Sequence, residues 1–115
     1  MENKLRPVIT VRVFADEKCF GPGIASLLQN VKKLHSLRAA AGEMGMAYSK
    51  AWTILRNSEA NLGCKLLHST TGGKNGGGAD LTQEAERLLE AYTAYCSELR
   101  AYGERLFAEK FQNIP

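Results

Sequence analysis

Residues 36–63 read SLRAAAGEMGMAYSKAWTILRNSEANLG, and this stretch predicts two short helices joined by a tight turn. Ser36 is a suitable N-cap for the first helix, and Gly45 is a suitable residue just past its end. The second helix is expected to close at Gly63. Residues 39–41 are alanines, whose small side chains let another helix approach closely. The stretch is therefore a candidate helix-turn-helix, a motif that places its second helix in the major groove of DNA.

The second of these helices separates an apolar side from a polar side. If Tyr48, Trp52 and Leu55 face the core, with Trp52 as a core anchor, then basic and donor-rich side chains face outward or lie at the edge. Such side chains suit base edges and phosphates. The alternative is an ordinary solvated helix face. We expect DNA contacts at Arg38, Ser49, Lys50, Thr53, Arg56 and Asn57.

Two patterns upstream predict strands followed by a helix. Residues 7–14, PVITVRVF, are rich in β-branched side chains and alternate between two faces, which predicts a strand. Residues 18–20 are expected to return as a short second strand. From Ile24 to Leu34, apolar side chains recur at helical spacing, which predicts a helix.

A glycine-rich segment follows the helix-turn-helix. Five of the nine residues 70–78 are glycine, and they lie between an apolar run at 66–67 and a second short run at 79–81. This predicts a hairpin with a glycine-rich tip, whose backbone N–H groups can approach phosphate closely. A nucleotide-binding P-loop is excluded because asparagine follows the Gly-Lys pair, whereas a flexible linker stays the alternative. The tip residues expected at DNA are Thr71, Gly72, Gly73, Lys74, Asn75 and Gly76.

The last helix carries a regular apolar stripe. Thr82 caps it, and it is expected to run to about Phe111, a length of about 40 Å. Eight residues from Leu81 to Leu106 alternate spacings of four and three, which is an a/d seam. We expect a homodimer through this seam, with packing on the N-terminal strands as the alternative. The expected dimer contacts are Leu88, Tyr92, Tyr95, Leu99, Tyr102 and Leu106.

The charge distribution agrees with a polyanionic partner. The formal net charge is only +3, but residues 31–78 carry seven basic and two acidic side chains, whereas residues 79–115 carry four basic and seven acidic ones. Three cysteines without a CxxC pair argue against a disulfide framework or a thiolate metal cage. His35 and His68 show no metal-ligand spacing, so no metal site, cofactor or catalytic centre is expected. We also expect no signal peptide and no membrane span, and hence a cytoplasmic protein.

Three segments together resemble a known family: FGPGIASLLQNV at 20–31, the stretch from 36 to 67, and TGGKNGGGADLT at 71–82. They are similar to the N-terminal DNA-binding domain of ModE-type molybdate-responsive transcription regulators, itself similar to the LysR-type winged helix. The resemblance covers roughly residues 5–110. It implies that the recognition helix holds Ser49, Lys50, Trp52 and Thr53, that the wing spans Thr71 to Ala79, and that dimer contacts come from the N-terminal strand and the last helix.

Two departures from that family matter. Ala47 stands where the family usually has serine, so we expect the N-cap of the recognition helix to be lost. The family's C-terminal oxyanion-binding domains have no counterpart in these 115 residues, so no molybdate binding is expected from this chain alone.

The sequence as a whole predicts a mainly α fold with small β elements. Residues 1–81 are expected to form a winged helix-turn-helix with N-terminal strands, and residues 82–115 a long dimerisation helix of the same structural unit. The expected function is sequence-specific binding of double-stranded DNA by a homodimeric transcription regulator. The alternative is a protein-interaction module that pairs with a full-length regulator without binding an operator itself.

Overall fold

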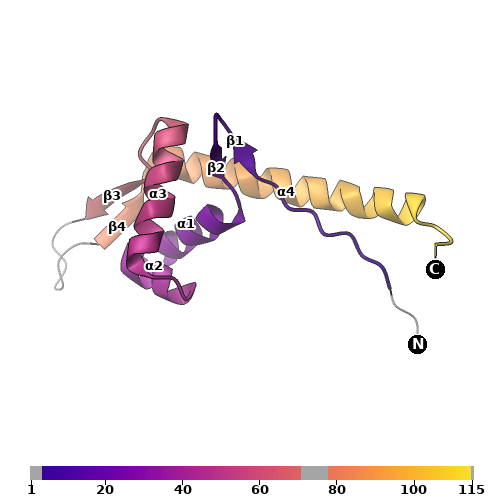
Figure 1. The fold of residues 1–115 in the computed structure, drawn as a ribbon, viewed down its shortest axis with the longest axis horizontal. Helices are drawn as coiled ribbons and strands as arrows, with labels where there is room; N and C mark the ends of the chain where they lie inside the picture. The colour runs from indigo at the N-terminus through magenta and orange to yellow at the C-terminus, as the bar shows by residue number, and fades with distance from the viewer. Residues whose placement is uncertain (1–3, 71–77, 115) are drawn as a thin grey trace.

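A computed structural model describes residues 4–70 and 78–114, which form four helices and two small hairpins (Figure 1). The elements of the helix-turn-helix and its hairpin gather at one end, and the last helix projects far beyond them. The longest dimension of the molecule is 60 Å. In chain order the elements are β1 (Val13–Phe14), β2 (Lys18–Phe20), α1 (Pro22–Leu34), α2 (Leu37–Glu43), α3 (Tyr48–Leu62), β3 (Leu67–Thr70), β4 (Gly78–Leu81) and α4 (Gln83–Lys110).

Helix α1 forms the centre of the core. Its predicted apolar face is buried, with Leu27, Leu28 and Val31 fully enclosed. Helices α2 and α3, strand β4 and the start of α4 pack around it. Each fully buried leucine contributes roughly 1.5–3 kcal/mol through removal of its apolar surface from water. The predicted helix is therefore confirmed, and its apolar face holds the other elements together.

The predicted helix-turn-helix is also confirmed. The Ser36 hydroxyl oxygen accepts a hydrogen bond of 3.0 Å from the Ala39 backbone N–H and so caps α2. Helix α2 ends at Glu43, and Gly45 follows with φ of +64°, a conformation that favours glycine. Ala40 and Ala41 are buried against their neighbours, as their small size predicts. Gly63, with φ of +76°, closes α3.

Strands β3 and β4 pair antiparallel, from Leu67 opposite Leu81 to Thr70 opposite Gly78. This hairpin, called the wing below, confirms the predicted strand pair at both flanks of the glycine-rich segment. Leu66 and Leu81 anchor its base in the core. The wing therefore follows α3 directly and leads straight into α4.

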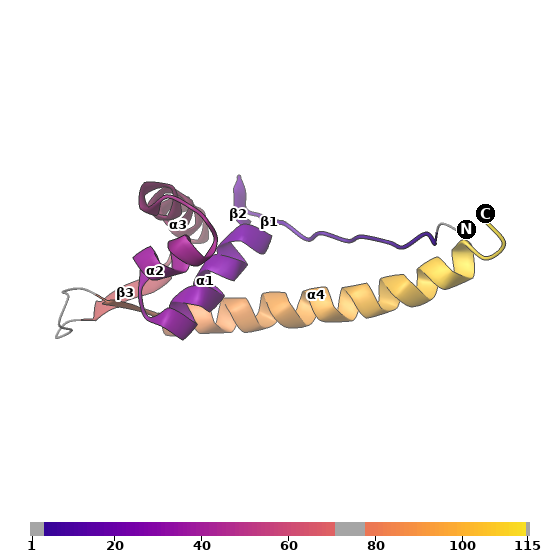
Figure 2. The same cartoon turned by 90° about the horizontal axis from the view of Figure 1, so that it is seen from below.

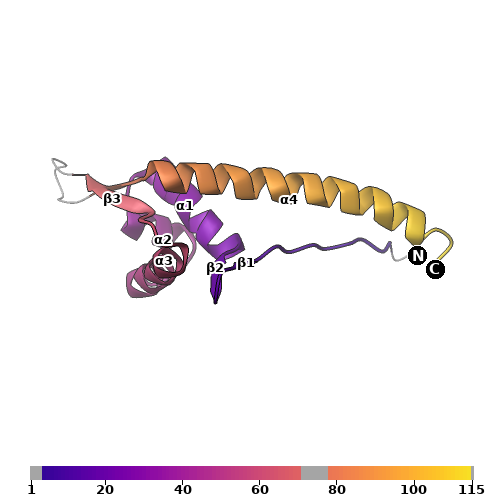
Figure 3. The same cartoon turned by 90° about the horizontal axis from the view of Figure 1, so that it is seen from above.

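Of the strand predicted over residues 7–14, Val13–Phe14 is confirmed, as is the return strand Lys18–Phe20, but residues 7–12 form no strand. Only Val13–Phe14 pair with β2, because β2 is three residues long and offers no ladder to the rest. Residues 4–12 instead run beside α4 (Figures 2 and 3). The Tyr92 hydroxyl donates a 2.6 Å hydrogen bond to the Val11 carbonyl, and Ile9 lies so close to Gly103 that a Cβ there would be 2.5 Å from its Cδ1. Helix α4 thus contacts the side of this segment that the alternating pattern predicted to be the buried face of a strand.

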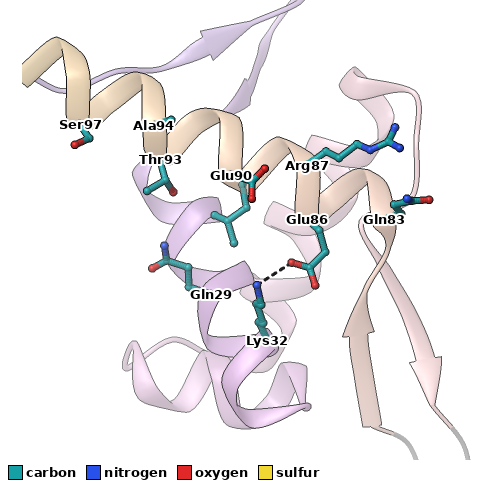
Figure 4. Close-up of a pocket in the computed structure, with 10 residues that line it drawn as sticks. Gln29, Lys32, Gln83, Glu86, Arg87, Glu90, Thr93, Ala94 and Ser97 are labelled. Carbon is teal, nitrogen blue, oxygen red and sulfur yellow. Dashed lines mark ion pairs between the residues drawn. The ribbon is translucent and has the colours of Figure 1, made fainter.

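Helix α4 packs on helix α1 through its N-terminal part. The Thr82 hydroxyl accepts a 3.1 Å hydrogen bond from the Ala85 N–H, which is the predicted cap. Leu89 is buried, and Lys32 of α1 forms a 2.9 Å ion pair with Glu86 (Figure 4). Beyond these contacts α4 extends away from α1–α3 (Figure 3). Among the described helices, none combines the length and the apolar character needed to cross a membrane.

Candidate nucleic-acid interface

Helix α3 presents the polar face that the sequence predicts. Ala51, Leu55 and Ser58 are buried against the core. On the opposite side Ser49, Lys50, Thr53, Arg56 and Asn57 are all exposed. The Thr53 hydroxyl donates a 3.1 Å hydrogen bond to the Ser49 carbonyl, which leaves its oxygen free to accept. The orientation of these five side chains is confirmed, and their role at DNA stays a prediction.

Two arginines lie over aromatic rings at the edge of this face. The Arg38 guanidinium carbon is 4.2 Å from the centre of the Tyr48 ring, and Arg56 is 5.1 Å from the centre of the Trp52 ring. Stacking of this kind holds a cation in place by the charge distribution of the ring. Trp52 is half-buried and packs against the core, so it both anchors α3 and supports Arg56.

The Arg38–Tyr48 stack joins α2 to the first turn of α3 and was not predicted. Trp52 and Arg56 are four residues apart on one helix, a spacing that brings side chains together, so this pair could be predicted from the sequence. Nine residues, the turn included, lie between Arg38 and Tyr48, so only the packing of α2 on α3 brings them together. The stack fixes a positive charge beside the N-terminal end of the predicted recognition helix.

An open groove of about 810 Å³ separates α3 from the wing. Arg38, Tyr48 and Trp52 line it on the helical side, and Lys65 and His68 line it on the wing side. Lys65 was not among the predicted site residues, although it lies within residues 31–78, where basic side chains are in excess. The groove makes the exposed face of α3 and the base of the wing neighbouring surfaces.

The base of the wing is tied to α3 by Glu59. This side chain is only 13% exposed, and its Oε2 accepts a 2.8 Å hydrogen bond from the Leu66 backbone N–H. The Lys65 ammonium lies 4.0 Å from the other carboxylate oxygen. Glu59, one of the two acidic residues among residues 31–78, therefore has a structural role that the sequence did not predict.

The predicted wing-tip contacts Thr71, Gly72, Gly73, Lys74, Asn75 and Gly76 lie outside the described residues. Their part in DNA binding stays a prediction from the sequence.

The predicted dimer seam divides into two parts. Tyr92 is engaged within the chain, where its ring meets Phe20 edge-on at 5.1 Å and its hydroxyl binds Val11. Leu88 packs against the core, and Leu99 is half-buried. Farther along α4, Tyr95, Tyr102 and Leu106 are 61%, 56% and 37% exposed. The first half of the seam thus completes the chain's own core, and the second half is exposed in the single chain.

Ala47 confirms the predicted departure at the start of α3. It occupies the N-cap position with extended backbone angles, φ of −64° and ψ of 144°, and supplies no side-chain hydrogen bond to the first turn.

The sequence of this fold matches a known family over more than half its length. Residues 25–86 match the bacterial regulatory helix-turn-helix proteins of the lysR family. The chain belongs to that family. The match runs from α1 through the wing to the first turn of α4, so it covers the three helices and the groove described above.

Relatives within this family include ModE proteins. The transcriptional regulator ModE of Haemophilus influenzae is 39% identical over 71 residues, which are 62% of this chain and 28% of the relative. The molybdenum-pterin-binding protein MopB of Rhodobacter capsulatus is 38% identical over 69 residues, 60% of this chain and 26% of the relative. The dual regulator ModE of Escherichia coli K12 is 33% identical over 81 residues, 70% of this chain and 29% of the relative.

These matches confirm the resemblance to a ModE-type N-terminal domain. The chain spans less than a third of the length of the curated relatives it matches.

Proposed function

We propose that this chain is a cytoplasmic transcription regulator that binds duplex DNA in a sequence-specific manner through α3 and the wing. The observation that carries the proposal is the face of α3, where five polar or basic side chains are exposed beside a groove that leads to the wing. Its family and its ModE relatives, one of them named a DNA-binding regulator, support the same function.

The geometry suits base contacts by one set of side chains and contacts to the DNA backbone by another. A helix in the major groove presents its exposed N-terminal side chains to base edges, which here are Ser49, Lys50 and Thr53. Arg38 and Arg56, held over their aromatic rings, lie beside this face and suit the flanking phosphates. The sequence preference would then come from α3 and the salt-dependent affinity from the arginines and the wing.

The experiment is a binding titration on a duplex selected by the wild-type protein from a random pool. Lys50→Ala and Thr53→Ala are each expected to weaken binding to that duplex by about 5- to 150-fold, the loss expected when a good base contact is removed. Both side chains are exposed, so the fold should be unchanged. Lys110→Ala, at the far end of α4, is the matched control and should bind as the wild type does. Wild-type affinity in both α3 variants would refute this role of α3.

We further propose that the regulator acts as a homodimer through the distal half of α4 and the N-terminal segment. Tyr95, Tyr102 and Leu106 on α4, and Leu5 and Val8 on the segment beside it, are exposed in the single chain. A second copy would remove this apolar surface from water. Two-fold symmetry would also present two recognition helices to an inverted-repeat operator. Sedimentation equilibrium at tens of micromolar should give the dimer mass, and a monomer would contradict the proposal.

A further inference from the structure

Helices α1, α2 and α3 are each followed by a residue in the left-handed backbone conformation, and one of these three residues is not glycine. Each end is followed by a residue with positive φ: His35 at +58°, Gly45 at +64° and Gly63 at +76°. Glycine suits this conformation because it has no Cβ, asparagine tolerates it, and most other residues are strained there. The chain uses glycine at two ends and histidine at the third. A side chain kept in a strained position suggests that the side chain itself is used.

Three successive residues of β4 lie in close contact with His35. The Ala79 backbone N–H donates a 3.0 Å hydrogen bond to the His35 carbonyl. The His35 Nδ1 lies 2.6 Å from the Asp80 Oδ1. At Gly78 a Cβ would come within 2.9 Å of the same carbonyl and 2.6 Å of the Thr70 hydroxyl, so only glycine allows this approach. The end of α1 and one strand of the wing are therefore in direct backbone and side-chain contact.

The wing has a second attachment on its other side. Glu59 of α3 accepts a hydrogen bond from the N–H of Leu66, just before β3, whereas His35 at the end of α1 contacts β4. Helices α1 and α3 share one core, in which Leu28 and Leu55 are both buried. A hairpin held at one point is free to turn about it, but a hairpin held on both strands by one rigid body has a fixed direction.

We propose that His35 is a wing-positioning residue, whose carbonyl and imidazole together fix the direction of the wing relative to α3. The proposal rests on the proposed function, because the direction of the wing matters where the wing and α3 contact one duplex. The His35 and Asp80 side chains are 67% and 39% exposed, so their pairing adds little to the stability of the fold. Its effect is expected on the orientation of the wing.

The surrounding charges set the size of the expected effect. Asp80 lies opposite His68 across the β-ladder, and opposite residues of an antiparallel pair share a face. His68 therefore faces Asp80 on the same side of the wing. On α1 itself, Lys32 is paired with Glu86 of α4, and Lys33 is the other cation of the last turn. Removal of the imidazole is thus expected to loosen the wing without unfolding it.

Three variants separate the side chain from the backbone. His35→Gly removes the imidazole but keeps the carbonyl and supplies the residue that best tolerates positive φ. His35→Asn tolerates this conformation too and places an amide donor near the position of Nδ1, so it is the conservative rescue. Asp80→Ala removes the acceptor. A purely structural role would predict that His35→Gly raises the melting temperature with no other change.

The first readout is the direction of the wing in the free protein. Residual dipolar couplings of the β3 and β4 amides, measured against those of α1, should change in His35→Gly and Asp80→Ala and stay as in the wild type in His35→Asn. Hydrogen exchange of the Ala79 amide should become faster in the first two variants. Unchanged couplings and unchanged exchange in both would overturn the proposal.

The second readout is affinity for the selected duplex. His35→Gly and Asp80→Ala should each bind about threefold more weakly, the change expected when one exposed side-chain hydrogen bond is lost, whereas His35→Asn should bind as the wild type does. Altered couplings with wild-type affinity would overturn the link between wing direction and DNA binding. Wild-type protein that binds no duplex would refute the proposed function instead, and the couplings would still decide whether His35 holds the wing.

Discussion

The two ends of this molecule differ in how they deal with apolar surface. At the first end, leucines of α1, α2, α3, β4 and α4 pack together in one core, and the exposed polar face of α3 lies on the surface of this core. Farther along α4, Tyr95, Tyr102 and Leu106 remain exposed although the N-terminal segment runs beside this helix. The first end is complete within one chain. The second leaves apolar side chains exposed in the single chain, and the predictions below test that difference.

The largest effect is expected from Leu28→Ala in the enclosed end. Leu28 is fully buried, so the change should lower the free energy of unfolding by about 2–5 kcal/mol through lost burial and a cavity. Leu106→Ala is the matched control in the open end, where Leu106 is 37% exposed, and should cost less than about 1 kcal/mol in dilute protein. Urea denaturation measures both. Equal losses would mean that the two ends do not differ as described.

The next effect concerns the open end in concentrated protein. Replacing Leu99 and Leu106 together with Asp places charge in the second half of the seam and should convert dimers into monomers, because unpaired charges are costly to bury in an interface. Sedimentation measures the mass, and circular dichroism checks that the helices remain. Specific DNA affinity should fall far more than non-specific affinity, because only an inverted repeat needs both half-sites. A dimer that survives the double substitution would place the interface elsewhere.

A smaller effect is expected at the start of α3. Ala47 has the extended backbone of an N-cap residue but no side-chain acceptor. Ala47→Ser should therefore stabilise the protein by about 1 kcal/mol, and Ser36→Ala should destabilise it by a similar amount through the loss of an existing cap. Thermal unfolding measures both changes. An Ala47→Ser protein no more stable than the wild type would show that α3 gains nothing from a cap.

The smallest effect is expected where the two ends meet. Tyr92→Phe removes the hydrogen bond to the Val11 carbonyl and should cost about 0.5 kcal/mol at neutral pH, because Tyr92 is only partly buried. Burial raises the pKa of the Tyr92 hydroxyl, and the neighbouring Cys96 thiol adds to this. The neutral phenol is thus favoured in the folded state.

The pH dependence of this difference has a definite sign. The stability from Tyr92 is fully present below its ordinary pKa of about 10 and is lost as the pH rises through the higher pKa of the folded state. The wild type should therefore lose its advantage over Tyr92→Phe above about pH 10. Denaturation of both proteins at pH 7 and pH 10.5 measures this, and a constant difference would contradict the assignment.

Much of the helix-turn-helix end could be predicted because its signals are local. Ser36, Gly45 and Gly63 mark helix ends through properties of single residues, and the spacing of Leu27, Leu28 and Val31 gives the buried face of α1. The exposed face of α3 followed from the same periodicity. The error at residues 7–12 had a physical cause: alternation reports that one face of a segment is covered, but not whether a strand or a helix covers it.

The amino-acid sequence by itself determined the helices, their caps, the strand pairing at the wing and the side of α3 that faces outward, since each depends on a pattern within one short stretch of the chain. Only the tertiary structure decided what covers the N-terminal segment, where Glu59 is used, and that His35 meets Asp80. The hydrogen bond between Tyr92 and Val11 spans 81 positions of the sequence, and the one between His35 and Asp80 spans 45. Such contacts follow from how the helices pack around α1, and no local pattern encodes them.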